Sequence, residues 1–248
     1  MKTFIYMHDG TFDGLLTCIF DAYVTGETPA NIIAAGDLAL ALDQEIKQIL
    51  TSPAKAARVQ NGIIHTLGEE AAENVFTASL STDPDTGKAI FNFLQLGFRV
   101  GRSANSMLSD PSVWKLHAIC RLVRREQHAF TEFLRFGELT GGVYLSEFKP
   151  NANILPLIMP HFAGRFNDCA FVIHDKGRRM AGVYDKSGWY LTSTERMTLP
   201  AFTQGERDMR ALWKLFFQSI TIKERVKPTR QRNVMPIKYR KYMTEFID

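Results

Sequence analysis

A short stretch in the middle of the chain combines one histidine with several arginines, side chains suited to acid–base chemistry beside a phosphate group. These residues are Arg124, Arg125, His128 and Arg135. The arginines lie three, four and seven residues from the histidine, so most of the set can share one face of a helix. The histidine would transfer a proton near neutral pH while the arginines hold phosphate oxygens. The alternative interpretation is a salt-bridge network in which Glu132 and Glu138 pair with the arginines.

The sequence DGTFDG at Asp9–Gly14 stands between a predicted strand and a predicted helix. Free amide groups at a helix N-terminus, with glycines on either side, could accept a phosphate. Thr11 or Asp13 could equally be a plain helix cap, which we favour, because the spacing is not GxGxxG and no Lys-Ser/Thr pair follows. Asp9 is nevertheless a candidate carboxylate partner for a catalytic histidine, as is Glu138.

A second histidine–arginine pair, His161 and Arg165, is spaced four residues apart. It could complete the same pocket if this segment folds against the helix that carries His128, although a histidine beside Phe162 is also typical of a core. The histidines form no HExxH or HxH motif and the cysteines no CxxC, so we expect no metal and no cofactor. No serine or cysteine stands in a nucleophile-elbow motif.

The pattern of apolar residues predicts an α+β fold, mostly helical, in a single domain over residues 1–248. Helices are expected over 15–24, over 53–102 in three segments, over 111–137 and over 205–222, with a short helix or helical turn within 153–166. Strands are expected over 3–7, 143–145, 169–174, 179–184 and 189–194. We expect one small antiparallel sheet, made of the N-terminal strand and the strands within 143–194. Residues 38–50 fit a strand or a helix.

Positive charge gathers near the C-terminal end, although the net charge of the whole chain is only +4. The basic segment, residues 222–242, carries a net charge of +7 and leaves −3 for the rest of the chain. Its charged residues are Lys223, Arg225, Lys227, Arg230, Arg232, Lys238, Arg240 and Lys241 against Glu224. Interleaved with Tyr239 and Tyr242, these cations could neutralise phosphates and release counterions. A solvated tail and a surface for an acidic protein are the alternatives.

Composition places the chain among ordinary globular proteins, with 45% hydrophobic and 23% charged residues. The 18 phenylalanines are many, and core packing is the first interpretation for them. No secretory leader is expected, because the apolar run after Lys2 ends at His8, and no stretch approaches the length of a membrane span. With three widely separated cysteines, the chain is expected to be cytoplasmic.

Several landmarks in order carry a resemblance to a known family. They are DGTFDGLL at 9–16, VRREQHAF at 123–130, FLRFGEL at 133–139, NILPLI at 153–158 with His161-Phe162 and Arg165-Phe166, LWKLFF at 212–217 and MPIKYRK at 235–241. Over nearly its full length the chain resembles a bacterial family that is catalogued as a domain of unknown function and labelled as a DNA-repair or DNA-metabolism protein. Such proteins are similar to partners of a radical-SAM protein proposed to modify or repair DNA, and similar domains occur fused to uracil-DNA-glycosylase-like domains.

Three hypotheses follow. The resemblance and the basic segment favour a DNA-binding accessory protein that presents damaged or modified DNA to a radical-SAM partner. The second is a DNA-repair enzyme, a glycosylase or a phosphodiester hydrolase, with His128 as acid–base and Asp9, Glu138 or His161 as further candidates. The third is a protein–protein scaffold without DNA contact. The predicted nucleic-acid contacts are Arg124, Arg125, Arg135, Arg165, Arg225, Arg230, Arg232, Lys238, Arg240 and Lys241.

Overall fold

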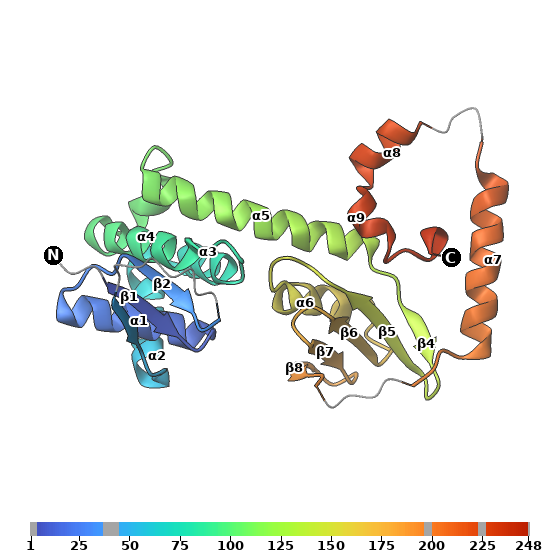
Figure 1. The fold of residues 1–248 in the computed structure, drawn as a ribbon, viewed down its shortest axis with the longest axis horizontal. Helices are drawn as coiled ribbons and strands as arrows, with labels where there is room; N and C mark the ends of the chain where they lie inside the picture. The colour runs from blue at the N-terminus through green and yellow to red at the C-terminus, as the bar shows by residue number, and fades with distance from the viewer. Residues whose placement is uncertain (1–3, 37–44, 196–199, 223–226, 248) are drawn as a thin grey trace. The chain divides into compact units, whose positions relative to one another are not determined.

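The computed structural model describes residues 4–36, 45–195, 200–222 and 227–247, and the chain divides into two compact units (Figure 1). Unit 1 is Met1–Arg124 and unit 2 is Arg125–Asp248. The helix α5 (Pro111–Phe133) is continuous across the boundary. Because both units share this helix, the division does not test the predicted single domain, which stays a prediction.

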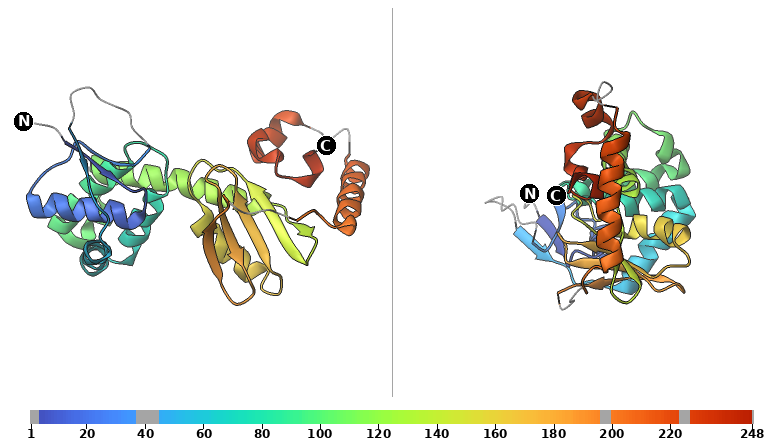
Figure 2. Two further views of the ribbon diagram at one scale, coloured as in Figure 1. Left: turned by 60° about the horizontal axis from the view of Figure 1, so that its bottom comes forward. Right: turned by 90° about the vertical axis from the view of Figure 1, so that its right-hand side faces the viewer.

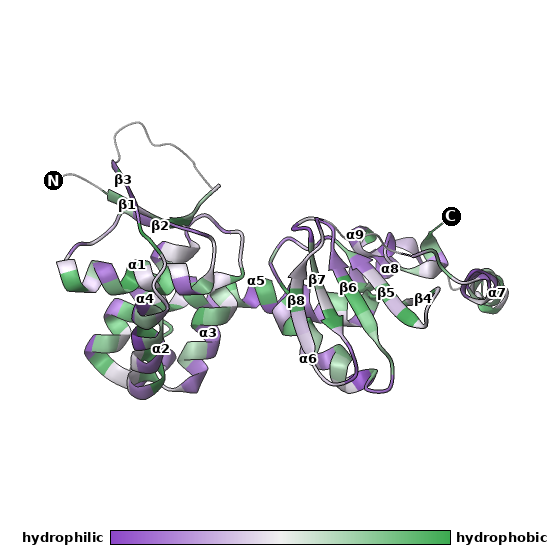
Figure 3. Cartoon of the chain, turned by 90° about the horizontal axis from the view of Figure 1, so that it is seen from below, coloured by the Kyte–Doolittle hydropathy of each residue, from purple (hydrophilic) through white to green (hydrophobic). Residues whose placement is uncertain are grey.

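Unit 1 is built on a small, entirely parallel sheet. It holds β1 (Phe4–His8), α1 (Phe12–Thr25), β2 (Asn31–Ala34), β3 (Glu45–Gln48), α2 (Pro53–Leu67), α3 (Glu69–Ser79), α4 (Thr86–Val100), the 3-10 helix η1 (Gly101–Ser106) and the first part of α5. The strand order is β2-β1-β3, and β1 pairs in parallel with both neighbours. Helices α1 to α4 gather on one side of this sheet (Figure 3).

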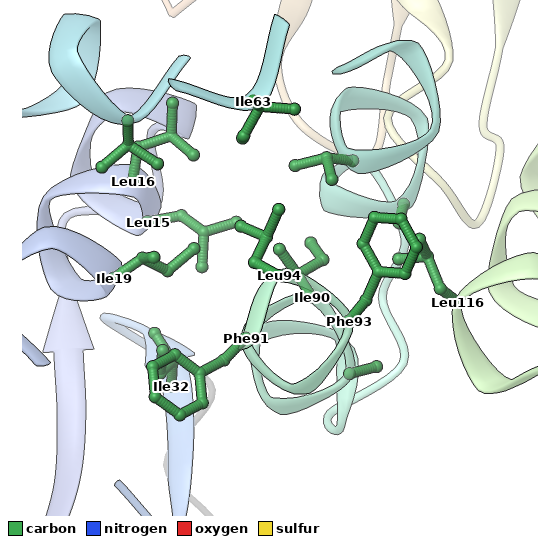
Figure 4. Close-up of a cluster of buried hydrophobic side chains, with 14 of the residues drawn as sticks. Leu15, Leu16, Ile19, Ile32, Ile63, Ile90, Phe91, Phe93, Leu94 and Leu116 are labelled. Carbon is green, nitrogen blue, oxygen red and sulfur yellow. The ribbon is translucent and has the colours of Figure 1, made fainter. Parts of the chain in front are cut away.

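The core of unit 1 lies between these helices and the sheet. Figure 4 shows apolar side chains from α1, α2, α4, α5 and β2 pointing toward one another. Phe93 and Leu94 of α4 and Leu16 of α1 are fully buried there. Each such side chain contributes about 1.5–3 kcal/mol when removed from water, so the cluster accounts for much of the stability of this unit.

Unit 2 carries a second, mixed sheet. It holds the end of α5, β4 (Gly137–Leu139), β5 (Val143–Phe148), α6 (Leu155–Arg165), β6 (Phe171–Asp175), β7 (Met180–Tyr184), β8 (Trp189–Ser193), α7 (Gln204–Ile220), α8 (Pro228–Val234), α9 (Ile237–Arg240) and the 3-10 helix η3 (Thr244–Phe246). The strands follow one another in the order β4 to β8, antiparallel except for the parallel pair β5–β6. Helix α6 joins that pair and covers one face of the sheet (Figure 2).

The α+β class is confirmed, and the expected small antiparallel sheet is partly right: the strands within 143–194 do form one sheet, antiparallel except for the pair β5–β6. The N-terminal strand is not part of the sheet formed within 143–194; it lies in a separate parallel sheet with β2 and β3. Antiparallel neighbours can be joined by a tight turn, whereas a helix between two paired strands carries the chain back and makes the pair parallel. Helices α1 and α6 do this in β1–α1–β2 and β5–α6–β6. Of the ambiguous residues 38–50, Glu45–Gln48 form a strand and 37–44 lie outside the described residues.

The long helix α5 begins as predicted at Pro111 and ends at Phe133, four residues before the expected end, because Gly137 already belongs to β4. Its apolar face is buried, from Val113 to Phe130. In unit 2 the buried Glu126 accepts hydrogen bonds from the backbone amides of Asn151 and Ala152, 3.0 and 2.8 Å away. These bonds hold the loop before α6 against α5.

Helix α7 is anchored at its first turn, and further along Trp213 and Phe217 contact Glu245 and Phe246. Thr203 caps it by accepting from the amide of Glu206, and its own amide donates to the carbonyl of Glu138 in β4. No residue of α7 is buried, and its apolar side chains include the exposed Met209, Leu212 and Phe216. No helix among the described residues has the length and apolarity to cross a bilayer.

Candidate functional site

Unit 2 contains a cavity of about 940 Å³, here called the aromatic cavity. Its walls come from the end of α5, from β5 and β6, from α6 and the turn after it, and from α7. The lining residues are Thr131, Glu132, Leu134, Arg135, Phe136, Tyr144, His161, Phe162, Arg165, Phe166, Cys169, Phe171, Glu206, Met209, Arg210, Trp213 and Thr244. Phenylalanine and arginine, four and three residues respectively, dominate this set.

Phenylalanine rings form one continuous wall. Phe136, directly after α5, packs edge-on against Phe162, Phe166 and Phe171, with ring centroids 5.1, 5.1 and 5.6 Å away. Phe162 and Phe171 are buried behind, while Phe136 and Phe166 are half-buried. Trp213 of α7 is 44% exposed and lines the same cavity. The accessible rings therefore offer faces on which a planar ligand can stack.

Arg135 is fixed at the end of α5. Its guanidinium donates to the carbonyl oxygens of Glu132 and Leu134, 3.1 and 3.3 Å away, and so covers acceptors that the helix end leaves free. It also pairs with Glu245, at 3.2 Å. Glu245 is nearly buried and accepts in addition from Nε1 of Trp213, 3.4 Å away. One carboxylate thus holds both the arginine and the tryptophan of the cavity.

Arg210 is fixed by contacts at the base of α7. Its Nε lies 2.6 Å from Oε1 of Glu206, and its guanidinium lies 4.3 Å from the centroid of the Phe202 ring. Oε2 of the same glutamate accepts from the amide of Glu138. The guanidinium packs over Gly137, where a Cβ would overlap it and would lie 2.7 Å from the Phe202 ring. Glycine is therefore required at this position by close packing.

The remaining polar groups of the cavity are Tyr144, His161, Arg165 and Cys169. Burial, followed by the charge of Glu138, raises the pKa of the Tyr144 hydroxyl, which therefore stays a hydrogen-bond donor at neutral pH. His161 and Arg165 are exposed, and the guanidinium of Arg165 lies 5.8 Å from the Phe166 ring. Arg165 has no carboxylate partner among the described residues.

A second cavity of about 360 Å³, here called the cationic groove, shares Arg135, Arg210 and Thr244 with the aromatic cavity. Its lining residues are Arg135, Leu145, Glu147, Lys149, Lys176, Phe202, Arg210, Lys241, Tyr242, Thr244 and Ile247. Tyr144 lines one cavity and Leu145 the other, and neighbouring strand residues point to opposite faces of a sheet. The two cavities therefore flank β5 and meet at the shared arginines.

Five cations and one carboxylate line the cationic groove. Lys176 pairs with Glu147, 2.9 Å apart. Lys149 and Lys241 are exposed and have no carboxylate partner within the described ranges; the ammonium of Lys241 lies 4.9 Å from the Tyr242 ring. The groove therefore retains positive charge and favours an anion.

The predicted catalytic candidates divide between the two units, Asp9 in unit 1 and His128, Glu138 and His161 in unit 2. His128 lies on the surface of α5, 78% exposed, with Nε2 3.1 Å from Oε1 of Glu132, and it lines neither cavity. Asp9 belongs to unit 1, where its carboxylate accepts from the amide and hydroxyl of Thr11; the hydroxyl bond lowers its pKa most. Glu138 lies in β4, and His161 alone of the candidates lines the aromatic cavity. No group of three or more potential metal ligands is present in the described part of the chain.

The predicted nucleic-acid contacts also separate. Arg135 and Arg165 line the aromatic cavity, and Lys241 lines the cationic groove. Arg124 donates instead to Oδ1 of the buried Asn74 within unit 1, 2.7 Å away. Exposed positions outside both cavities are those of Arg125, Arg230, Arg232 and Lys238. Arg240 packs over the Phe246 ring, and Arg225 lies outside the described residues.

Several residues of the site were not singled out from the sequence. They are Tyr144, Lys149, Cys169, Lys176, Glu206, Arg210 and Trp213. The one local signal was the spacing of four between Glu206 and Arg210, which is typical of an ion pair on a helix. Tyr239, which the sequence places among the cations of the basic segment, is 5% exposed and packs against Phe130.

No curated protein sequence matches this chain. Among solved structures it is similar to a pGpG-specific phosphodiesterase, PggH, from Vibrio cholerae, with 12% identity, a TM-score of 0.33, and coverage of 88% of this chain and 98% of that one. A likeness of that level carries no argument about fold or activity. The family model named "Domain of unknown function (DUF4130)" matches residues 84–245, a range that includes every residue of the aromatic cavity. The chain therefore belongs to the DUF4130 family, as the order of its sequence landmarks led us to expect of a family of unknown function.

Proposed function

We propose that the chain is a DNA-binding protein and that unit 2 binds the DNA strand. The observation that carries this proposal is the cationic groove, in which Lys149 and Lys241 lie beside Arg135 and Arg210 without a carboxylate partner among the described residues. Cations without carboxylate partners gain most from a phosphate, because binding releases the counterions condensed on the nucleic acid. The resemblance to DNA-repair and DNA-metabolism proteins supports DNA as the ligand.

Exposed cations of α8 and α9 extend the positive charge of unit 2 beyond the groove. Arg230 and Arg232 lie on α8, and Lys238 on α9. Each phosphate contact contributes about −0.9 to the slope of log K against log salt concentration for duplex DNA. Two or three contacts in the groove therefore predict a slope of about −2 to −3, and further contacts from the helices would make it steeper.

The direct test is DNA binding by the double variant Lys149→Gln/Lys241→Gln, measured by fluorescence anisotropy on single-stranded and duplex oligonucleotides over a range of salt concentrations. Both side chains are exposed, so the fold should be retained. We expect binding about tenfold weaker than that of the unaltered chain at 0.1 M salt, and a slope reduced by about 2 on duplex DNA.

Lys186→Asn is the matched control, because it removes one exposed positive charge of unit 2 that lines neither cavity. Lys186 has a φ of 78°, a conformation that asparagine tolerates better than most residues. This variant should bind as the unaltered chain does. Absence of DNA binding at low salt, or equal losses in the control and the double variant, would contradict the proposal.

Presentation of damaged or modified DNA to a radical-SAM partner is the finer form of this proposal, and it rests on the resemblance. The test compares the affinity of the radical-SAM partner for the complex of the full chain with DNA, for the full chain alone and for DNA alone. The proposal expects the tightest binding to the complex. The enzyme hypothesis is tested in parallel with His128→Ala and His161→Ala on damaged oligonucleotides. Loss of turnover in either variant with unchanged DNA affinity would favour an enzyme over an accessory.

A further inference from the structure

We propose that the aromatic cavity receives one unpaired base of the DNA strand whose phosphates lie in the cationic groove. This inference rests on the proposed function and deepens it, because it names the form of DNA that the protein prefers. The ligand is a strand with an unstacked nucleotide, from a bulge, a mismatch or a single-stranded stretch.

The first support is the composition of the cavity. Its accessible rings, Phe136, Phe166 and Trp213, come from three different segments and offer apolar planar surface. A nucleobase is planar on both faces, and stacking on such rings does not depend on which base is present. The volume of about 940 Å³ exceeds the need of one nucleotide and falls in the range of small-molecule sites.

The second support is the connection between the two cavities. Arg135 and Arg210 line both, so a phosphate at these guanidinium groups can lie in the groove while its own base enters the aromatic cavity. Both arginines are held in place by a carboxylate, Glu245 and Glu206 respectively. A guanidinium presents five N–H donors, so those not used by the carboxylate or, in Arg135, by the carbonyls of Glu132 and Leu134 stay available to a phosphate.

The third support is the set of polar groups around the rings. Tyr144 is a donor, Cys169 is half-buried, and Arg165 at the rim has no carboxylate partner among the described residues. Groups of this kind can hydrogen-bond the edge of a base or the next phosphate along the strand. Three arginines around the rings are not typical of a cavity that serves apolar packing alone, because burying charged groups costs free energy.

The two tryptophans of unit 2 provide a matched test. Trp213 and Trp189 are 44% and 39% exposed, and only Trp213 lines the aromatic cavity. Affinity is measured for a duplex with one unpaired adenine, for the same duplex with an abasic site at that position, and for the fully paired duplex. The unaltered chain should bind the unpaired base about tenfold more tightly than the abasic form.

Trp213→Leu should abolish this preference, whereas Trp189→Leu should retain it. Trp213→Phe keeps a ring but loses the N–H that Glu245 accepts from, so retention of the preference in this variant assigns the effect to stacking. Arg165→Gln, at an exposed position, should weaken binding of all three duplexes without changing their order.

Three results would overturn the inference and leave the proposed function standing. The first is DNA binding that depends on Lys149 and Lys241 but is equal for unpaired and abasic duplexes. The second is a preference that Trp213→Leu and Trp189→Leu reduce equally. The third is competition by a free nucleoside monophosphate at micromolar concentration, which would assign the cavity to a free nucleotide instead of a DNA strand. If the unaltered chain does not bind DNA at low salt, both the proposed function and this inference are wrong.

Discussion

Phenylalanine residues have different surroundings in units 1 and 2. In unit 1, Phe91 and Phe93 of α4 are almost completely buried in a continuous core (Figure 4). In unit 2, Phe136 and Phe166 remain half-exposed around a cavity, and α7 buries none of its residues. Apolar surface left open beside positive charge is typical of a binding site, whereas a closed core supports the fold. Under the proposed function, unit 1 is therefore the scaffold and unit 2 carries the surface that binds DNA.

The largest effect is expected from a phenylalanine in the core of unit 1. Phe93→Ala should lower the free energy of unfolding by about 3–5 kcal/mol, because it removes a fully buried ring and leaves a cavity. Phe166→Ala in unit 2 should lower it by about 1 kcal/mol, because that ring is already partly in contact with water. Urea unfolding followed by circular dichroism measures both values. Equal losses would mean that the rings of the aromatic cavity are as structural as those of the core.

A medium effect is expected from the glycine beneath Arg210. Gly137→Ala should lower the free energy of unfolding by about 1–3 kcal/mol and weaken DNA binding, because its Cβ would displace the Arg210 guanidinium, the Phe202 ring and the Glu206 carboxylate. The matched control is Gly205→Ala in α7, where nothing lies within 4 Å of the added Cβ. The free energy of unfolding of the control should rise by about 0.5 kcal/mol, because alanine lowers the entropy of the unfolded chain. Parallel behaviour of the two variants would show that Arg210 is not held by this contact.

The smallest effect is a pH dependence in unit 1. Burial, followed by the hydrogen bond to Glu27, raises the pKa of Tyr6 to about 12, whereas an unfolded tyrosine has a pKa of about 10. The unfolded chain therefore loses this proton first as the pH rises. The stabilisation is present below pH 10 and should fall by about 1 kcal/mol by pH 11. The difference in unfolding free energy between the unaltered chain and Tyr6→Phe, measured from pH 8 to 11, isolates this change; a difference that is constant with pH would contradict it.

The sequence predicted helices and strands that have a long, regular pattern of apolar residues. It did not predict strands of only three or four residues. The three-four spacing of Val113, Leu116 and Cys120 was enough to place α5. Strands β2 and β4, of four and three residues, carry too few positions for a period of two to be recognised. Parallel pairing depends on which strands meet in space, which local propensity does not encode.

The candidate site was partly predictable for the same reason. Arg135 and Arg165 stood out because each belongs to a set of charged residues with the spacing of a helix. Arg210 and Trp213 reach the site because Thr203 and Glu206 tie α7 to β4 and because Trp213 donates to Glu245. These are contacts between residues distant in sequence. His128 was singled out for its spacing from the arginines on a helix, and the structure places it on the exposed surface of α5, where its role stays a prediction.

The central claim is that unit 2 binds the DNA strand. It is tested most directly by photo-cross-linking the full chain to an oligonucleotide with one unpaired 5-iodouracil. Mass spectrometry then identifies the cross-linked peptides. The account predicts cross-links to the peptides that contain Tyr144, Phe166 or Trp213, and their loss when an excess of unlabelled oligonucleotide is added. Cross-links confined to peptides of unit 1 would contradict it.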